Sequence, residues 1–250
     1  MQDKYYQFTI LKKYPQIIQV YTKKPINVNL NQVTKKKRDT IYQTIAKDQN
    51  YQFKKIKSSY QTHSSNVVII NQENLDTEII DCDALITNLK GVALTMTTAD
   101  CQSIFLYDPI NEVIANIHSG WKGTLNTIVL NTINLMQDKF NSNPQDIIAC
   151  ISPSIGKCCF EVDEDVYLLF KEKFPFIDDF TENKKINNSL IKYYIDTKEL
   201  NKYLLIKAGL KEDNIEISPI CTKCEYNTYH SYRASKNESG RNLSLIALKE

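Results

Sequence analysis

The chain has 250 residues, 42% of them hydrophobic and 24% charged, and its formal net charge is +2. These values are ordinary for a globular protein, and so small a charge surplus does not favour nucleic-acid binding. The sequence contains no stretch of about 18 apolar residues, so no membrane-spanning helix is predicted. The N-terminus lacks the apolar segment that is typical of a signal peptide.

The first half of the chain predicts one helix start and four short strands. The run KKKR at 35–38 is interpreted as the solvated start of a helix rather than a basic patch. The sequence DPIN, with proline after aspartate, predicts a turn and therefore a hairpin between the last two strands. The predicted strands, which are rich in apolar and β-branched residues, lie at 66–71, 92–98, 103–108 and 112–118.

The second half alternates between helices and strands. Beyond Gly123 the apolar residues adopt helical spacing, which predicts a helix over 125–140 with Thr124 as its N-cap. The C-terminal segment 240–249 is compatible with a strand or a helix. Alternation of this kind predicts a mixed α/β fold without a domain boundary. The remaining predictions are strands at 146–151 and 214–220, helices at 163–174 and 197–209, and a polar surface loop at 181–189.

Three side chains that can bind a metal stand next to predicted strand ends. His63 precedes one strand, Cys101 follows another, and His118 ends a third. Strand ends are where α/β folds place their chemistry. Two imidazoles and one thiolate form a ligand set for Zn²⁺ with an open fourth position. Each residue alone is also compatible with a buried structural role, and without metal Cys101 and His118 could serve as nucleophile and base of a hydrolase.

Six blocks in this chain carry a family resemblance that extends from about residue 60 to the C-terminus. They resemble the YfiH/laccase-domain family, also called the multicopper polyphenol oxidase or purine nucleoside phosphorylase family. The resemblance implies a single domain over 1–250 with a layered α/β/β/α fold and mixed sheets. The blocks are QTH at 61–63, DALIT at 83–87, TADC at 98–101, HSGWKG at 118–123, PSIGKCCFEV at 153–162 and SYRASKNESGR at 231–241.

The resemblance also implies a metal and an activity. His63, Cys101 and His118 would bind one Zn²⁺, with Cys101 and His118 in the catalytic centre. The implied enzyme cleaves adenosine, inosine and methylthioadenosine with phosphate, or deaminates adenosine. Its partners would be a purine nucleoside and phosphate, with neither nucleic acid nor membrane, and the chain would be a monomer or homodimer.

Two other functions are weighed against this one. A polyphenol oxidase with Cu²⁺ is an alternative, because His/Cys sites bind copper, but three histidines in the whole chain are too few for several copper ions. A zinc-stabilised interaction module is disfavoured, because three ligands leave a coordination position open.

The arginines are the next candidates. The chain has 28 lysines but only three arginines. Arg233 and Arg241 lie in the last of the six blocks, and Arg38 resembles the family's further N-R block, with Lys37 in place of the Asn. Because a guanidinium binds phosphate through two parallel hydrogen bonds, we expect Arg38, Arg233 and Arg241 to bind phosphate. Arg241 is expected to be catalytic as well, and Arg233 has a structural alternative. His230 is a further candidate for substrate binding, as an acid/base group at the mouth of the site.

Several neighbours of these residues have two interpretations. Gly120 and Gly123 are expected to allow a tight turn and a close approach. Trp121 packs either beside the site or in the core, and Asp100 either orients a ligand or occupies a turn. The seven irregularly spaced cysteines favour a reducing cytoplasm. The CxxC at 221–224 is weak evidence of a metal site, so its cysteines are interpreted as ordinary buried or free thiols, although Cys158 and Cys159 could supply partners.

Overall fold

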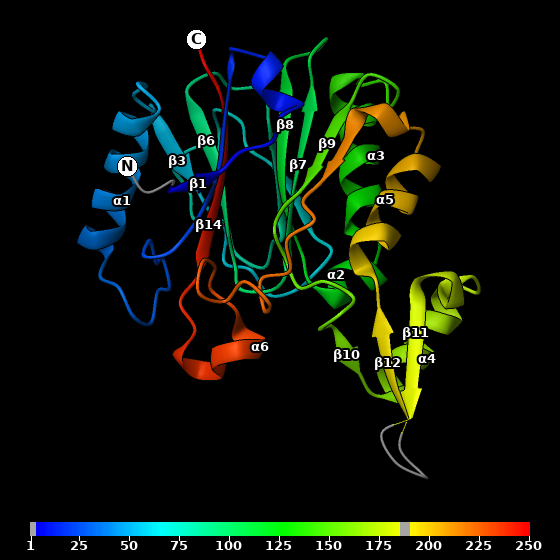
Figure 1. The fold of residues 1–250 in the computed structure, drawn as a ribbon. Coiled ribbons are helices and arrows are strands. Elements are labelled where there is room, and N and C mark those ends of the chain that lie inside the picture. The colour runs from blue at the N-terminus through cyan, green and yellow to red at the C-terminus, as the bar shows by residue number, and fades with distance from the viewer. Residues whose placement is uncertain (1–3, 186–190) are drawn as a thin grey trace.

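The structure is a computed structural model that describes residues 4–185 and 191–250. Its main body has four layers (Figure 1): helix α1 (Lys35–Asp48), a five-stranded sheet, a six-stranded sheet, and the helices α3 (Ile128–Phe140) and α5 (Thr197–Lys207). The α/β/β/α layering implied by the resemblance is therefore confirmed. Among the described residues, no helix has the length and apolar character needed to cross a membrane.

The five-stranded sheet contains both ends of the described chain. The C-terminal segment is a strand that pairs antiparallel with two neighbours, one near the N-terminus and one from the middle of the chain. Only the β3 and β6 pair is parallel. In order across the sheet, the strands are β1 (Tyr5–Tyr6), β2 (Ile17–Thr22), β14 (Asn242–Leu248), β6 (Val92–Thr98) and β3 (Lys55–Lys57).

The six-stranded sheet contains the predicted hairpin. Strands β7 and β8 pair antiparallel from Gln102 to Asp108, and the Asp108 carboxylate accepts hydrogen bonds from the backbone N–H groups of Ile110 and Asn111 in the turn. The two edge pairs of this sheet are parallel. In order, the strands are β13 (Ile215–Ile217), β9 (Ile148–Ile151), β7 (Gln102–Asp108), β8 (Val113–Ser119), β5 (Ala84–Thr87) and β4 (Val67–Ile69).

Three apolar cores fill the spaces between the four layers. Successive side chains of β7 point to opposite faces, as the strand period requires. Ile104 and Leu106 face α3 and α5, whereas Phe105 and Tyr107 lie between the two sheets. The third core, which includes Ile45 of α1, covers the outer face of the five-stranded sheet.

The helix predicted over 125–140 begins three residues later, at Ile128 of α3, and ends at Phe140 as predicted. The short helix α2 (Trp121–Leu125) precedes α3, and Thr127 separates them in a left-handed conformation with φ of 55°. The predicted N-cap is wrong, because Thr124 lies inside α2. Its hydroxyl is buried and bonds to the side chains of Ser119 and Asn201.

The polar loop predicted at 181–189 is wrong for its first five residues. They form strand β11 (Thr181–Lys185), which pairs with β12 (Ile191–Ile195), and β12 pairs in turn with β10 (Glu161–Val162). This small antiparallel sheet projects from the main body beside α4 (Glu164–Lys173), so its polar side chains are solvated (Figure 1). Residues 186–189 lie outside the described part. The remaining helices are α6 (Tyr232–Ser235) and short 3-10 helices at Leu11–Lys13, Ile177–Phe180, Glu212–Asn214 and Lys236–Glu238.

Candidate functional site

A pocket of about 510 Å³ opens where β6 and β8 end and β7 begins. This volume is typical of a site for a small molecule. Thr97 and Arg241 reach it from the side of the five-stranded sheet, and Cys101 and His118 from the six-stranded sheet. Its walls include the aromatic side chains of Trp121, Phe160 and Tyr232.

The three predicted metal ligands meet in this pocket. The possible ligand atoms of His63, Cys101 and His118 all lie within 4.8 Å of one another. Cys101 Sγ is 3.7 Å from His63 Nε2, and the two imidazole rings are 4.8 Å apart at 80°. His118 is buried and His63 is exposed, so the group is open to solvent on the His63 side.

Asp83 orients both histidines and was not among the site residues predicted from the sequence. Its fully buried carboxylate lies 2.7 Å from His118 Nδ1 and accepts a hydrogen bond of 3.1 Å from the backbone N–H of His63. Ser64 adds two more hydrogen bonds, from its N–H and its hydroxyl. An ionised carboxylate only accepts, so His118 Nδ1 is the donor. Nε2 is then the nitrogen left for a metal, which would take the place of the proton that Nε2 carries when His118 is positively charged.

The charges and hydrogen bonds around Cys101 favour the thiolate form of its side chain. Burial alone would raise the pKa of Cys101, but the positive charge of His118 and hydrogen bonds from both histidines lower the pKa to about 6. Burial also opposes ionisation of Asp83, yet hydrogen bonds from His118 and Ser64 hold its pKa at about 2. A thiolate and a carboxylate-oriented imidazole are the forms in which these residues bind metals.

The side chains of the metal ligands leave no room for a side chain at Gly120. A Cβ at this position would lie 2.7 Å from the His63 ring and 3.1 Å from Cys101 Sγ. Its φ of −75° is open to any residue, so the need is for space and not for an unusual backbone conformation. At Gly123 the nearest atom to an added Cβ would be at an ordinary 3.5 Å. The expected close approach therefore holds for Gly120 only.

Asp100 and Trp121 each combine two roles. Asp100 occupies the turn between β6 and β7 with φ of 87°. Its carboxylate accepts hydrogen bonds from the Thr222 hydroxyl at 2.7 Å and the Arg233 backbone N–H at 2.6 Å. It thus ties two other segments to the turn that carries Cys101. Trp121 lines the pocket and also packs against the core, with its ring 6.5 Å from Phe170.

Two of the three arginines line the pocket. One guanidinium nitrogen of Arg241 donates to the carbonyls of Ser239 and Gly240. One nitrogen of Arg233 donates to the carbonyls of Cys159 and Glu161. These bonds hold both side chains in place and leave further N–H groups on each guanidinium for an anion.

Arg38 and His230 lie outside the pocket lining, contrary to expectation. Arg38 is on α1 and lines a second, separate hollow together with Lys35 and Lys54. His230 Nε2 lies 2.9 Å from the Ile26 carbonyl oxygen, and the His230 ring packs so closely against Gly240 that an added Cβ there would come within 2.4 Å. His230 therefore supports the loop that presents Arg241, and does not stand at the mouth of the site.

The structure adds Gln61 to the site as well. Its side-chain amide donates to the Thr97 carbonyl and accepts from the Thr97 N–H, both at 2.9 Å. This pairing fastens the segment that carries His63 to the end of β6. Gln61 and Asp83 both stand inside the blocks QTH and DALIT, so the signal that could have identified them was present in the sequence.

Comparisons with known proteins agree with this site and fold. Residues 25–249 match the family described as multi-copper polyphenol oxidoreductase laccase. The chain is 34% identical over 197 residues to the Bacillus subtilis purine nucleoside phosphorylase YlmD, covering 76% of this chain and 69% of that protein. It is 31% identical over 196 residues to adenosine deaminase RL5 from an unknown prokaryotic organism, covering 76% and 73%.

A solved structure extends the likeness to the whole fold. The crystal structure of the Bacillus licheniformis hypothetical protein YfiH matches with a TM-score of 0.84 and 25% identity, over 99% of this chain and 100% of that one. The family match over residues 25–249 includes His63, Cys101 and His118, and the structural match covers both sheets. The chain therefore belongs to the multi-copper polyphenol oxidoreductase laccase family, to which the YfiH resemblance pointed.

Proposed function

We propose that the pocket is the active site of a zinc-dependent purine nucleoside enzyme. The proposed reactions are phosphorolysis of adenosine, inosine and methylthioadenosine, and deamination of adenosine. The observation that carries the proposal is the convergence of two imidazoles and a thiolate in a pocket that two arginines also line. The names of the relatives, purine nucleoside phosphorylase and adenosine deaminase, support it.

The donor set fits a zinc ion. His63, Cys101 and His118 would hold it, since one soft thiolate and two imidazoles are ligands that Zn²⁺ prefers. Asp83 supplies the carboxylate partner that metal-binding histidines usually have. When bound, Zn²⁺ acts as a Lewis acid and makes a bound water more acidic. Cu²⁺ also binds such donors, so metal analysis decides between the two.

The other pocket residues suit the two substrates. Trp121, Phe160 and Tyr232 offer faces on which a purine base can stack. Arg241 and Arg233 carry fixed positive charge, which favours phosphate and can hold it beside the sugar. A thiolate at Cys101 would also suit a metal-free Cys-His hydrolase. Among the described residues, one group of possible metal ligands contains histidine, which disfavours multicopper chemistry.

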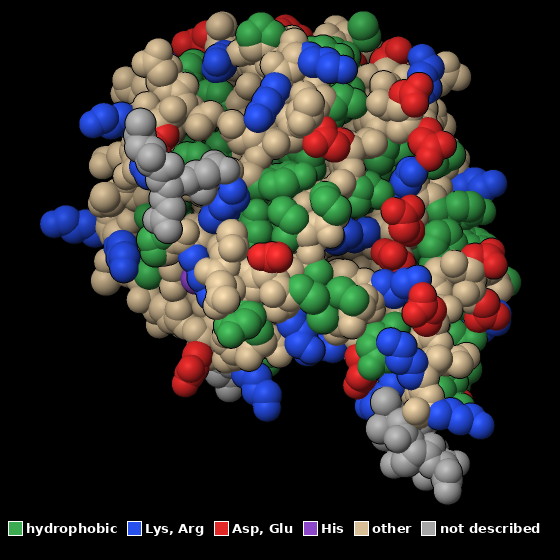
Figure 2. Space-filling model, in the orientation of Figure 1, with side chains coloured by type: hydrophobic (Ala, Val, Ile, Leu, Met, Phe, Trp, Pro, Cys, Tyr) green, Lys and Arg blue, Asp and Glu red, His purple; other side chains and the backbone are tan. Residues whose placement is uncertain are grey.

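Surface charge and cysteine state support the remaining expectations. On the face in Figure 2, acidic and basic side chains are interspersed, as expected of a protein without a nucleic-acid partner. None of the seven cysteines forms a disulfide, which favours a cytoplasmic location. A monomer or homodimer remains our expectation for the assembly.

A nucleoside panel with metal analysis tests the proposal. We expect base release from adenosine, inosine or methylthioadenosine to require phosphate, and adenosine to yield inosine without it. A chelator should remove activity and zinc should restore it, and Cys101→Ala should be inactive. Full activity of metal-free enzyme, lost on alkylation of Cys101, would support the hydrolase instead. Three or more bound coppers per chain would support the oxidase.

Arginine-to-lysine variants test the phosphate site. Lysine keeps the charge but loses the rigid pair of donors. Arg241→Lys should therefore raise the phosphate concentration needed for phosphorolysis at least about tenfold, which is about 1.4 kcal/mol, with the zinc content unchanged. Arg38→Lys is the matched control, because Arg38 lines a different hollow. An unaltered phosphate dependence in Arg241→Lys, or an equal effect in Arg38→Lys, would contradict the assignment.

A further inference from the structure

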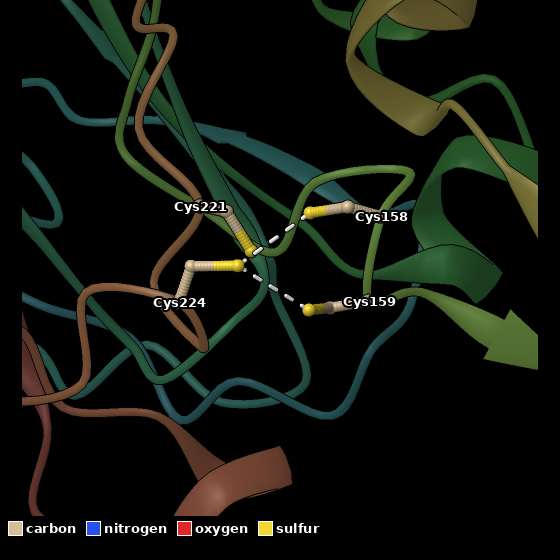
Figure 3. A group of neighbouring side chains, drawn as sticks. All are labelled: Cys158, Cys159, Cys221 and Cys224. Atoms are coloured by element: carbon tan, nitrogen blue, oxygen red, sulfur yellow. Dashed lines mark hydrogen bonds between the residues drawn. The ribbon is translucent and has the colours of Figure 1, made fainter.

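Four cysteines form a second cluster outside the pocket. Cys158 and Cys159 lie in the loop between β9 and β10, and Cys221 and Cys224 follow β13. Their side chains point toward one another (Figure 3), and all four sulfur atoms lie within 4.8 Å of one another. The sequence alone favoured ordinary buried or free thiols for the CxxC at 221–224. Folding brings it against the Cys-Cys pair more than 60 positions earlier in the chain.

The spacing of the sulfur atoms matches tetrahedral coordination of one ion. With zinc–sulfur bonds of about 2.3 Å, two ligands of a tetrahedral site are about 3.8 Å apart. Cys224 Sγ is 3.7 Å from Cys158 Sγ and 3.5 Å from Cys159 Sγ. Both distances are far longer than a disulfide bond of about 2.05 Å. The group is also too compact to surround a cluster of several iron atoms.

Polar groups around the cluster suit bound thiolates. The backbone N–H of Gly156 donates to Cys221 Sγ at 3.3 Å, a contact that stabilises negative sulfur. Lys198 is buried, and its ammonium donates to the carbonyls of Ser218 and Ile220 at 2.9 and 2.7 Å. Ile220 directly precedes Cys221. Four thiolates and one Zn²⁺ carry a net charge of −2, which a fixed ammonium nearby partly offsets.

The cluster is tied to the wall of the pocket. Between the two cysteines of the CxxC, Thr222 donates to Asp100, the residue before Cys101. The carbonyl of Cys159 accepts a hydrogen bond from the Arg233 guanidinium. Ile155 and Phe160, on either side of the Cys-Cys pair, line the pocket. An ion at the cluster would therefore fasten two loops that shape the pocket and position Arg233.

We propose that Cys158, Cys159, Cys221 and Cys224 bind a structural Zn²⁺ that holds these two loops together. Each thiol releases its proton to solvent as its zinc–sulfur bond forms, so four protons leave and nothing is oxidised or reduced. Four protein ligands close the coordination sphere, which is typical of a structural site, unlike the open three-ligand group in the pocket. The proposal rests on the cysteine geometry and is independent of the nucleoside activity.

Metal counting in purified variants tests this site. We expect two zinc ions per chain in the wild type, one in Cys101→Ala and one in Cys224→Ser. Cys150→Ala is the matched control, since Cys150 is buried in strand β9 and belongs to neither group, and it should keep two zinc ions. The decisive sample is Cys101→Ala, which lacks the proposed pocket metal, so its zinc count does not depend on any activity.

A spectroscopic measurement covers the case in which Cys224→Ser fails to fold. Cobalt exchanged into Cys101→Ala should give the intense visible bands of a tetrahedral four-thiolate site. Weak bands of an octahedral ion bound to oxygen and nitrogen would overturn the proposal. Zinc-free Cys101→Ala, unchanged zinc content in Cys224→Ser, or a disulfide among the four cysteines by mass spectrometry after purification under reducing conditions would also overturn it.

Discussion

At the scale of single residues, the close packing around the ligands makes Gly120 the sharpest test of the pocket. Gly120→Ala places a methyl group against the His63 ring and Cys101 Sγ, so we expect the pocket metal and the activity to be lost. Gly123→Ala is the control, because its added methyl group meets only ordinary contacts. Metal analysis and activity assays of both variants check this. Equal metal content in the two proteins would show that the ligands can move aside.

Asp83 should raise the zinc affinity of the pocket, because it orients the two histidine ligands. Asp83→Asn removes the charge that fixes His118 Nδ1 as a donor and places an amide N–H₂ among other donors. We expect the pocket to bind zinc about 10–100-fold more weakly, measured by competition with a chelator of known affinity. Asp81→Asn, an exposed neighbour, should bind zinc as the wild type does. Wild-type affinity in Asp83→Asn would rule out the orienting role.

At the scale of elements, the β7–β8 hairpin depends on Asp108. Burial opposes ionisation of this carboxyl, but hydrogen bonds that include those from Asn111 and Ile110 outweigh it and keep its pKa below the usual value. The folded state thus binds this proton less readily than the unfolded chain does. The resulting stabilisation is complete above about pH 4 and is lost as the pH falls below that value.

Asp108→Asn should show this pH dependence. The variant sets an amide N–H₂ against the Asn111 side-chain donor, which lies 2.8 Å from Asp108 Oδ2, so at neutral pH we expect a loss of about 1–3 kcal/mol in unfolding free energy. Urea unfolding at several pH values measures the unfolding free energy of the variant and of the wild type, and the difference between them should narrow below about pH 4. Asp138→Asn, on an exposed face of α3, is the control. A difference in unfolding free energy that stays constant with pH would contradict stabilisation by the ionised Asp108 carboxylate.

At the scale of the whole molecule, the two sheets must stay packed for the pocket to exist, because its walls come from both. Phe105 is fully buried between them, with its ring 6.0 Å from Phe8. Phe105→Ala should lower the unfolding free energy by about 3–5 kcal/mol. Ile110→Ala, in the exposed hairpin turn, should change it by less than about 0.5 kcal/mol. Similar urea midpoints for the two variants would contradict this.

The sheet pairing also bears on domain organisation. Strand β14, at the C-terminus, pairs with β2 near the N-terminus and with β6 from the middle of the chain. We therefore retain one domain over residues 1–250 as a proposal. Limited proteolysis checks it, since a single domain should yield no stable fragment that lacks either end.

The sequence by itself determined the elements whose patterns are local. Short runs of apolar and β-branched residues on either side of the turn at 108–111 predicted the β7–β8 hairpin, because strand propensity and turn chemistry act over a few positions. The helical spacing up to Phe140 predicted α3. Strand ends combined with the family blocks predicted the ligand set of His63, Cys101 and His118. The C-terminal strand was ambiguous because a short apolar run that is buried on both faces, such as Asn242–Leu248, has the same sequence pattern as a buried helix segment.

Only the tertiary structure decided which distant residues meet. The layer packing leaves Arg38 on α1 outside the pocket and brings Asp83 beneath His118. It also joins the Cys-Cys pair to the CxxC. In each case the partners lie far apart in the sequence. Their proximity depends on how sheets and loops pack, and a local pattern of side chains does not determine that packing.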